Sequence, residues 1–454
     1  MFRWKYQAFP LLGLALLSQV FMIPVAWALQ PLDEFLRAGA TQSFDSREAI
    51  AVAAQRNQEL LAAYAKLAPT ASATVTYTRN QNQVEVDLPQ LGPTGVPTGS
   101  PIMAVLTAVD QTDAVFSLGV PLVDAGAWQR IGVARDIAEA ARARQSAAVL
   151  DNQKQVARAY FQYVAAYALV AAGERARDAA SENEQTLLRR RQLGLSSELD
   201  LARASADTER ARQSIADAEL TRDLAARSLE TLTGLLPSGT VPALGVELRE
   251  EAPLPAWESA SARLPQVRAA VAEARAARKL ARAAWMTYVP SVSGMVSERL
   301  TNAGGFGQSA TWTAYLSLGW RADLASLYSA RAMQAAGDAS AVQSARTRRD
   351  AEDQIYNAWS RTRAYLARSR AARAQAESAQ LAASLSHKRY AAGSATQLEV
   401  IQAERDAFAA EVSRIQADAD LAYSRVLLRL NSGQFSGEPG SGTAHPAPTP
   451  TGTP

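Results

Sequence analysis

The chain has 454 residues, of which 48% are hydrophobic and 20% charged, with no cysteine and a formal net charge of +3. This length allows two to four ordinary domains or one elongated repeat protein. Without a block of basic residues, nucleic acid is not an expected partner, and without cysteine no disulfide can form.

Residues 1–28 have the pattern of a secretory signal peptide. Arg3 and Lys5 give a charged start, an apolar stretch runs from Leu11 to Val25, and residues 26–28 read Ala-Trp-Ala, a small-x-small cleavage pattern. The apolar stretch is interrupted and shorter than the roughly 20 residues that a membrane-spanning helix needs. We therefore expect export and cleavage, with an uncleaved membrane anchor as the alternative.

Residues 29–234 are expected to form a first structural repeat that begins with a helix and two strands. A helical periodicity over 46–66 precedes a strict alternation at about 69–79, in which Ala, Val and Tyr face one side and Thr and Ser the other. A polar, Pro/Gly-rich stretch, 79–101, separates it from a second alternating strand at about 113–122. Each strand therefore has one apolar and one polar face.

A long helical hairpin at about 127–233 completes this repeat. Residues 127–190 contain no proline and only two glycines. A single helix over these 64 residues would be roughly 96 Å long. The turn at 191–196 breaks it, and a returning helix follows.

The same order of elements returns over residues 259–433. Strands are expected at about 290–298 and 311–320, and a helical hairpin at about 324–431. In its returning helix, apolar residues at heptad spacing predict antiparallel coiled-coil packing, with seams of Ile401, Phe408, Ile415 and Ala422, and of Leu398, Val412, Ala419 and Val426. A Pro/Gly-rich linker, 235–258, joins the repeats. The tail, 434–454, is expected to be disordered.

The two hairpin turns are the clearest sign of duplication. The stretch 194–201 is echoed 199 residues later by 393–400, each with a turn glycine, a hydroxyl residue and an acid three residues after it. A tandem duplication of this size requires both halves to adopt the same structure. One loop departs from it: the offset is 221 at Pro69/Pro290 but 200 at Gly119/Gly319, so the first strand–strand loop is 21 residues longer.

The strands and the long hairpins together predict a membrane-spanning tube. Four strands cannot close a barrel that leaves a pore, whereas three chains would supply twelve. The apolar faces suit lipid and the Thr/Ser faces suit a water-filled lumen. The alternative is an ordinary soluble sheet that buries one face.

In this order of elements the chain resembles the TolC family of outer-membrane efflux proteins over roughly residues 45–433. The resemblance rests on the duplicated helix–strand–strand–helix order, on the Gly-x-x-[ST]-x-x-[DE] turns at 194–200 and 393–399, and on the strand exit at 120–126, similar to the family's Pro-apolar-x-Asp-Gly-Gly. The second strand exit, 320–324, lacks the proline and the glycine pair.

The resemblance implies a mainly α fold with transmembrane β-structure. Three copies would form a 12-stranded β-barrel in the outer membrane and an α-helical barrel of coiled-coil hairpins that projects into the periplasm. Such a protein is the passive exit duct of a tripartite efflux or secretion system, and it docks a periplasmic adaptor protein and an inner-membrane transporter.

The resemblance also implies that the two turns form the periplasmic tip where the adaptor docks, at Gly194, Leu195, Ser196, Gly393 and Ser394. A simpler interpretation accounts for the hydroxyl residues and acids that follow. Ser197-x-x-Asp200 and Thr396-x-x-Glu399 resemble capping boxes, which stabilise helix N-termini without any further function.

Two further roles are expected near the tip. Family members carry rings of acids on the inner helix after the second turn, and Glu399 and Gln402 match these positions, which predicts a single-ring pore constriction. We also hypothesise that a hydrogen bond between Tyr390 and Asp200 helps to close the tip.

Nothing in the sequence predicts an enzyme, a cofactor or a metal site. The histidines, His387 and His445, are isolated, and no cysteine can complete a usual metal or nucleophile set. Two alternatives to an efflux duct stay open: the channel of a type I protein secretion system, which shares the fold, and a periplasmic coiled-coil spacer without a pore. A copper or silver duct is less favoured, because the four methionines after residue 28 form no cluster.

Overall fold

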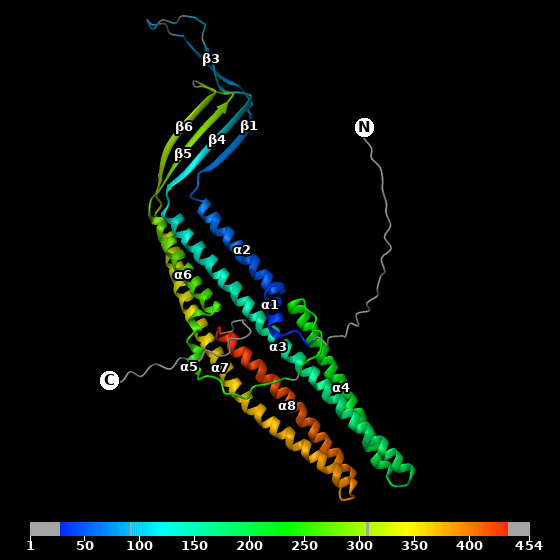
Figure 1. Cartoon of the computed structure of the whole chain (residues 1–454). Coiled ribbons are helices and arrows are strands. Elements are labelled where there is room, and N and C mark those ends of the chain that lie inside the picture. The colour runs from blue at the N-terminus through cyan, green and yellow to red at the C-terminus, as the bar shows by residue number, and fades with distance from the viewer. Residues whose placement is uncertain are drawn as a thin grey trace, which may run out of the picture.

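The structure, a computed structural model, describes residues 28–434 except 91, 92, 94, 96, 98, 101, 243, 306 and 307. The signal peptide and the tail expected at the two ends therefore lie outside the described residues, apart from Ala28 and Gln434. The molecule is elongated, with a β-sheet at one end and two long helical hairpins leading away from it (Figure 1). Within the described ranges, no helix is both long and apolar enough to cross a membrane.

The main sheet has the order β1-β4-β5-β6, and all neighbours are antiparallel. Its strands are β1 (Thr70–Arg79), β4 (Asp110–Val123), β5 (Ser291–Thr301) and β6 (Ala310–Gly319). The sheet joins the two halves of the chain, because β4 of the first repeat pairs with β5 of the second. The alternation in the sequence is the physical reason for these strands, since successive side chains point to opposite faces.

The strand register brings the apolar faces of the four strands together. Directly paired residues of an antiparallel sheet lie on the same face, and the pairs Ala73–Phe116, Leu118–Val296 and Val296–Ala314 connect all four strands. The opposite face carries hydroxyl groups that bond across strands, at 2.7 Å between Ser72 and Ser117. One side of the sheet is thus mainly apolar, with Glu298 between Phe116 and Trp312 as a charged exception, and the other side is mainly polar.

Both edges of the sheet are unpaired in one chain. Every residue of β1 and of β6 is exposed, and Trp312, Leu316 and Leu318 are 74%, 75% and 69% exposed. An open edge with exposed apolar side chains is a site for pairing with another strand. Because β1 and β6 run in opposite directions, β6 of one copy beside β1 of another would continue the antiparallel alternation.

The stretch between β1 and β4 contains a hairpin that was not expected from the sequence. Strands β2 (Val84–Leu88) and β3 (Ile102–Thr107) form a separate two-stranded sheet in the longer first loop. In the sequence, the alternation of Val84, Val86 and Leu88 is short, and it is followed by several prolines and glycines that disguise it.

Two helices of 68 residues each, α3 (Ala125–Gln192) and α7 (Leu324–Ala391), run from the sheet to the turns. They return as α4 (Glu198–Thr233) and α8 (Gln397–Asn431). Near the sheet their partners are α2 (Phe44–Ala65) and α6 (Pro265–Trp285). The strand exits differ in sequence, yet Asp124 and Asp323 cap the two long helices in the same way, each accepting a backbone N–H at 2.7 Å.

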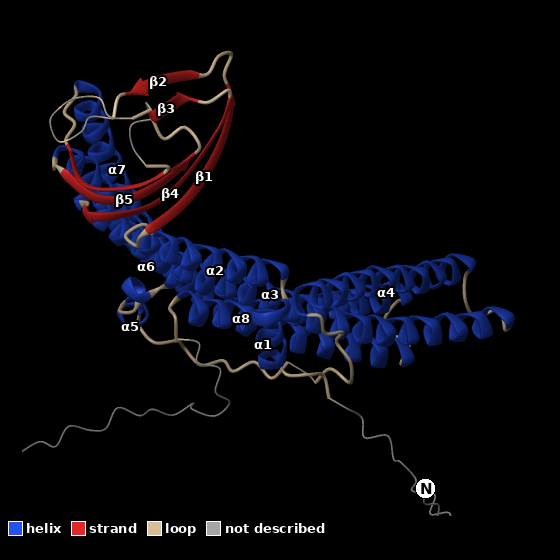
Figure 2. Cartoon of the chain, turned by 90° about the horizontal axis from the view of Figure 1, so that it is seen from above, coloured by secondary structure: helices blue, strands red, loops and turns tan. Residues whose placement is uncertain are grey.

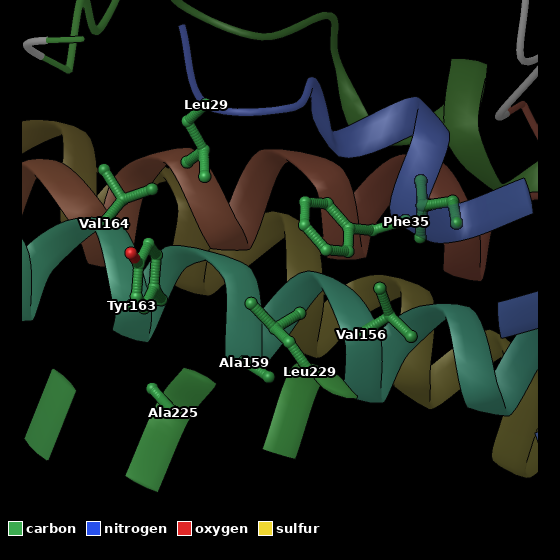
Figure 3. Close-up of a cluster of buried hydrophobic side chains, with 9 residues drawn as sticks. Leu29, Phe35, Val156, Ala159, Tyr163, Val164, Ala225 and Leu229 are labelled. Carbon is green, nitrogen blue, oxygen red and sulfur yellow. The ribbon is translucent and has the colours of Figure 1, made fainter. Parts of the chain in front are cut away.

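A hydrophobic cluster anchors the N-terminal segment in the middle of the molecule (Figure 3). Helix α1 (Leu32–Gln42) places Phe35 and Leu36 against Val156 of α3 and Leu229 of α4. On the other half, α5 (Leu254–Glu258) contributes Trp257 to a second cluster. The carbonyl of Ala252 in the linker accepts hydrogen bonds from Trp257 at 3.1 Å and from Trp359 at 3.0 Å, which fixes the linker to α7.

Buried side chains, most of them small, recur every seven residues along the helices of both hairpins. The buried positions of α4 include Ala204, Ala211, Ala218 and Ala225, and those of α7 include Ile355, Thr362, Ser369, Ala376 and Ala383. Such spacing is typical of left-handed coiled-coil packing. The seams expected in α8 are only partly buried: Ile401 and Ile415 are inside, whereas Leu398 is 39% exposed and the fully buried set includes Val400 and Leu421. Helix α8 contacts both α7 and α3, so its buried face is wider than two seams.

Asp418 of α8 is a buried acid that pairs with Arg373 of α7 and with Arg414 of its own helix. It is 1% exposed and accepts hydrogen bonds from Ser369 at 2.6 Å, from Arg373 at 3.1 Å and from Arg414 at 3.0 Å. Asp420, two residues on, makes a single contact with Arg368 at 3.3 Å and is half exposed. The two acids thus provide a buried pair and a surface pair on one helix.

We predict that Asp418→Asn lowers the free energy of unfolding by about 3 kcal/mol, because a buried ion pair is broken on one side: Arg373 loses its charged partner, and Arg414 keeps only Glu411. Asp420→Asn, the matched control, should change it by less than about 1 kcal/mol, as expected for an exposed pair. Urea unfolding of the detergent-solubilised protein measures both values. Equal effects of the two substitutions would contradict the importance of the buried network.

Candidate functional site: the two interhelical turns

The two turns between the long helices have the same backbone geometry. Leu195 N–H donates to the Arg190 carbonyl at 2.9 Å, and Ser394 N–H donates to the Arg389 carbonyl at 2.8 Å. Gly194 and Gly393 have φ values of +76° and +75°. These are Schellman motifs, which end a helix with a left-handed residue. The duplicated glycines are therefore required by the backbone itself.

The acids after each turn cap the returning helices differently. At the second turn a complete capping box forms: Glu399 N–H donates to Thr396 Oγ1 at 3.3 Å, and Thr396 N–H donates to the Glu399 carboxylate at 3.0 Å. At the first turn, Asp200 N–H donates to Ser197 Oγ at 3.1 Å, and the Ser197 hydroxyl donates to the Asp200 carboxylate at 2.6 Å. Aspartate is one methylene shorter than glutamate, so its carboxylate bonds the cap hydroxyl instead of the backbone.

The first turn presents large apolar side chains and the second does not. Leu193 and Leu195 are 74% and 73% exposed, whereas the second turn carries Ala392, Gly393 and Ser394 at its tip. A side chain added at Gly194 or Gly393 would meet nothing within 4 Å. Both tips are therefore open surfaces within one chain, with different chemistry.

Tyr390 and Asp200, expected to bond each other, have other partners in this chain. The Arg190 guanidinium donates to the Tyr390 hydroxyl at 2.9 Å, and its carbon lies 5.1 Å from the centre of the Tyr390 ring. Asp200 is bonded by Ser197, as described above. The first hairpin thus contacts Tyr390 through an arginine of α3, and the Tyr390–Asp200 hydrogen bond is not formed within the chain.

Glu399 and Gln402 lie on an exposed stripe of α8. Their neighbours Val400 and Ile401 are each 1% exposed and face the chain's own core. The stripe continues one turn further with Asp406, also exposed, which the sequence analysis did not single out. Its spacing of seven residues from Glu399 places both carboxylates on one helix face.

Polar contacts join the first hairpin to the second above the turns. Arg405 of α8 contacts Asp207 of α4 at 2.6 Å, and Gln397 of α8 donates to Asn183 of α3 at 2.9 Å. A cavity of about 750 Å³ lies between the two hairpins and is lined by residues of α3, α4, α7 and α8. These contacts could not be predicted from the sequence, because the paired residues are 198 and 214 positions apart and a single sequence carries no signal for such distant pairs.

His387, isolated in the sequence, meets Glu404 across the second hairpin at 2.6 Å. Both residues line the cavity, with Asp207, Arg405 and Arg373 nearby. Burial raises the pKa of Glu404 above its usual value of 4.5, while His387 lowers it. In the described part of the chain no group of three or more His, Cys, Asp or Glu side chains is placed to hold a metal ion.

This chain belongs to the outer membrane efflux protein family, whose sequence model matches residues 36–235 and 256–434. It is accordingly an outer-membrane efflux channel, located in the outer membrane with a periplasmic tunnel of helices, and its family is one of channel proteins.

Solved structures share the fold at low sequence identity. The outer-membrane channel OprN matches with a TM-score of 0.72 and 20% identity, over 89% of this chain and 90% of that one. The Campylobacter jejuni CmeC outer membrane channel matches with a TM-score of 0.73 and 16% identity, over 89% and 86%. The open state of the Neisseria gonorrhoeae MtrE outer membrane channel matches with a TM-score of 0.71 and 19% identity, over 88% of each chain. No curated protein sequence matches the chain significantly.

We predict that His387→Gln makes stability more sensitive to pH. The substitution removes a group that lowers the pKa of Glu404, so this pKa should rise further. A carboxyl whose folded-state pKa exceeds its unfolded value binds more protons when folded, and the free energy of unfolding therefore falls as pH rises from 4.5 through the folded pKa. The pH dependence of the unfolding midpoint measures the effect.

The double variant His387→Gln/Glu404→Gln is the control for this prediction. It should lose the extra slope, because the titrating carboxyl is gone. An unchanged pH dependence in His387→Gln alone would show that the histidine does not act on Glu404.

Proposed function

We propose that three copies of this chain form the exit duct, with a closed sheet of twelve strands in the outer membrane and a tunnel of helices below it. The observation that carries this proposal is the four-stranded sheet, which has two open edges of opposite direction and one largely apolar face that Glu298 interrupts between Phe116 and Trp312. Lateral pairing of β6 with β1 of the next copy satisfies the backbone groups of both edges, which lipid cannot do.

The stoichiometry is tested by the native mass of the protein purified in mild detergent. Three copies are expected, together with ion-conducting steps in planar bilayers. A folded monomer that inserts and conducts alone would overturn the proposal, and a folded, non-conducting particle that stays in the aqueous phase would favour the coiled-coil spacer.

Two finer points on partners belong to this proposal. The duct would receive its cargo from an inner-membrane transporter through a periplasmic adaptor, and the adaptor would dock on the two turns, at Gly194, Leu195, Ser196, Gly393 and Ser394. What supports this is the openness of both turns and, at the first turn, exposed leucines beside Arg190 and Arg191. Drug efflux and type I protein secretion remain alternative uses of the same duct.

Glu399, with Gln402, is proposed to line a constriction at the periplasmic end. Three-fold symmetry would bring three copies of the exposed stripe of α8 around one axis, and Asp406 would add a second acidic level. The Tyr390–Asp200 hydrogen bond stays a prediction only as a contact between neighbouring copies, because within the chain both groups are bonded elsewhere.

We predict that Glu399→Gln reduces the preference of the channel for cations, measured as the reversal potential in a salt gradient across a planar bilayer. Glutamine can take the same place in a capping box, so the substitution removes the charge and keeps the cap. Glu198→Gln, at the start of α4, is the matched control and should leave selectivity unchanged. Equal reversal potentials for the wild type and Glu399→Gln would reduce Glu399 to a helix cap.

We predict that Leu195→Ser weakens adaptor binding at least about tenfold. Burying a leucine side chain contributes about 1.5–3 kcal/mol, and about 1.4 kcal/mol corresponds to one factor of ten in affinity. The dissociation constant of the purified duct and its adaptor measures the effect. Leu236→Ser, at a 62% exposed leucine far from the turns, is the control, and an equal loss in both variants would argue against docking at the turn.

A further inference from the structure

The two repeats of the chain correspond residue by residue in the structure. The starts of α2 and α6 (44 and 265) and of β1 and β5 (70 and 291) each differ by 221 positions. The long helices α3 and α7 differ by 199 positions at both their starts (125 and 324) and their ends (192 and 391). Each residue of these elements therefore has an equivalent in the other repeat.

One helix contact joins the two repeats within the chain, and we call it the in-chain joint. Helix α6 of the second repeat packs on α3 of the first, so that neighbouring helices follow the order α2, α3, α6, α7. The helices at the two ends of this row are α2 and α7. A duplicate of the in-chain joint would place α2 on α7, and between the ends of one row it can form only with another copy.

The face of α3 that meets α6 is a buried stripe, and its equivalent on α7 is exposed. The buried residues on the face of Asp136 recur at spacings of three and four, as one side of a helix requires; they are Val133, Asp136, Ala140 and Ala143. Their equivalents 199 positions later are all exposed; they are Ala332, Ala335, Ala339 and Val342. Val342 alone is 70% exposed.

Helix α2 shows the complementary difference from α6. The stripe of α6 on the face of Lys279 is buried, apart from Lys279 itself, which is half-buried; it consists of Ala272, Ala276, Lys279 and Ala283. The equivalents 221 positions earlier are all exposed; they are Ala51, Gln55, Gln58 and Ala62. The chain thus leaves uncovered both of the stripes that a duplicate joint would bury.

Ion pairs hold the in-chain joint. The carboxylate of Asp136, which is 3% exposed, lies 2.8 Å from Nζ of Lys279, and Lys279 also donates to the Gly132 carbonyl at 3.5 Å. Two further pairs cross the same joint, at 2.7 Å and 2.6 Å; they are Arg275–Glu139 and Arg144–Glu273. The lysine of α6 therefore sits between a buried acid and a glycine of α3.

The equivalent positions on α7 and α2 do not form this ion pair. Ala335 stands in the place of Asp136, and Gln58 stands in the place of Lys279. Arg331, which is exposed, stands in the place of Gly132. A neutral glutamine fits beside this arginine, whereas a lysine there would meet a like charge and no acid.

The sheet gives a register for the same duplicate contact. The pairs Thr70–Gly119 and Ser291–Gly319 show that β4 and β6 differ by 200 positions. The in-chain pair Leu118–Val296 then corresponds to Leu318 of β6 (118 + 200) beside Val75 of β1 (296 − 221). This register keeps the apolar faces together, which a shift by one residue would not. The curvature of the sheet is that of part of a closed wall (Figure 2).

We infer that α2 of one copy packs on α7 of the next with Gln58 opposite Ala335, and that the Asp136–Lys279 ion pair distinguishes the in-chain joint from this copy–copy joint. The inference rests on the proposed trimeric duct. If α2 occupied the stripe of α3, Asp136 would be buried without a cation, which is strongly unfavourable. If α6 occupied the stripe of α7, Lys279 would face Ala335 and Arg331. The two duplicated helices therefore cannot exchange places.

Cysteine pairs test the register, since the chain has no cysteine of its own. Ala335→Cys with Gln58→Cys, and Val342→Cys with Ala51→Cys, place thiols at matched positions of the copy–copy joint. Outer membranes are treated with dibromobimane, which joins only thiols that lie close together, and the chains are separated on a denaturing gel. Both double variants should give linked dimers and trimers.

The same four substitutions, recombined, are the control. Ala335→Cys with Ala51→Cys, and Val342→Cys with Gln58→Cys, keep the faces but shift the register by seven residues, about 10 Å along a helix. They should be linked severalfold less than the matched pairs. Equal linking of matched and recombined pairs would overturn the inferred register.

A charge exchange tests the role of the ion pair. Gln58→Lys places a lysine opposite Ala335 and Arg331, so the yield of trimers, measured as native mass in mild detergent, should fall severalfold. Adding Ala335→Asp to the same chain should restore it, because each copy then offers an acid to the lysine of the next. Leu61→Lys, at a position where α6 carries the exposed Arg282, is the control and should leave the yield unchanged.

The outcomes separate this inference from the proposed duct. If the wild-type protein is not a trimer and no cysteine pair links copies, the duct itself is wrong. If the wild type is a trimer but Ala335→Asp does not restore Gln58→Lys, the assigned pairing is wrong and the duct stands. Restoration would also show that Gln58→Lys impairs assembly and not the folding of the chain.

Discussion

Close packing of small side chains between long helices is the interaction on which the molecule depends. The helices α3 and α7 are 68 residues each, about 100 Å at the rise of an α-helix. In proteins most of the stability of a helix comes from the packing of one face and not from helix propensity. Alanine at seven-residue spacing in α4 permits a close approach along the whole hairpin. Larger side chains would push the helices apart, and the hairpins would then not present a continuous wall.

The polar contacts between the helices determine how the helices align with one another along their length. Asp418 joins α7 to α8 at a buried site, and Arg405–Asp207 joins the second hairpin to the first. Ion pairs of this kind cost desolvation and give little net stability, but they are satisfied in only one register of the helices. The register of the sheet is fixed in another way. If one strand shifted by one residue, its apolar side chains would move to the polar face of the sheet and its polar side chains to the apolar face.

Much of this architecture could be predicted from the sequence. Strict alternation identified the strands, and the absence of proline identified the long helices. The echoed turns identified the duplication and the caps at Ser197 and Thr396. These features depend on neighbours in the chain, and they are therefore written into short stretches of sequence.

The features that sequence reasoning missed depend on distant residues. The β2–β3 hairpin is stabilised by the loop between β5 and β6, and Val84 to Leu88 alone is too short to indicate a strand. We expected a hydrogen bond between Tyr390 and Asp200 because both lie close to the turns. In the structure the Tyr390 hydroxyl accepts a hydrogen bond from Arg190 instead, and Asp200 accepts one from Ser197, the N-cap residue of its helix. Glu404 drew no notice, since its burial follows from how two hairpins pack. A single sequence contains no information on which distant residues will contact each other.

The exposed edges of the sheet have a consequence for the life of the protein in the cell. A chain whose β1 and β6 are bare on both faces has no favourable resting state in water, so folding of the sheet, entry into lipid and association of copies are coupled steps. The amount of finished channel then depends on the concentration of newly exported chains by mass action. If new chains are exported too slowly, they would be degraded before they associate into channels. A change in the rate of synthesis would therefore change the number of channels by a larger factor than it changes the number of chains.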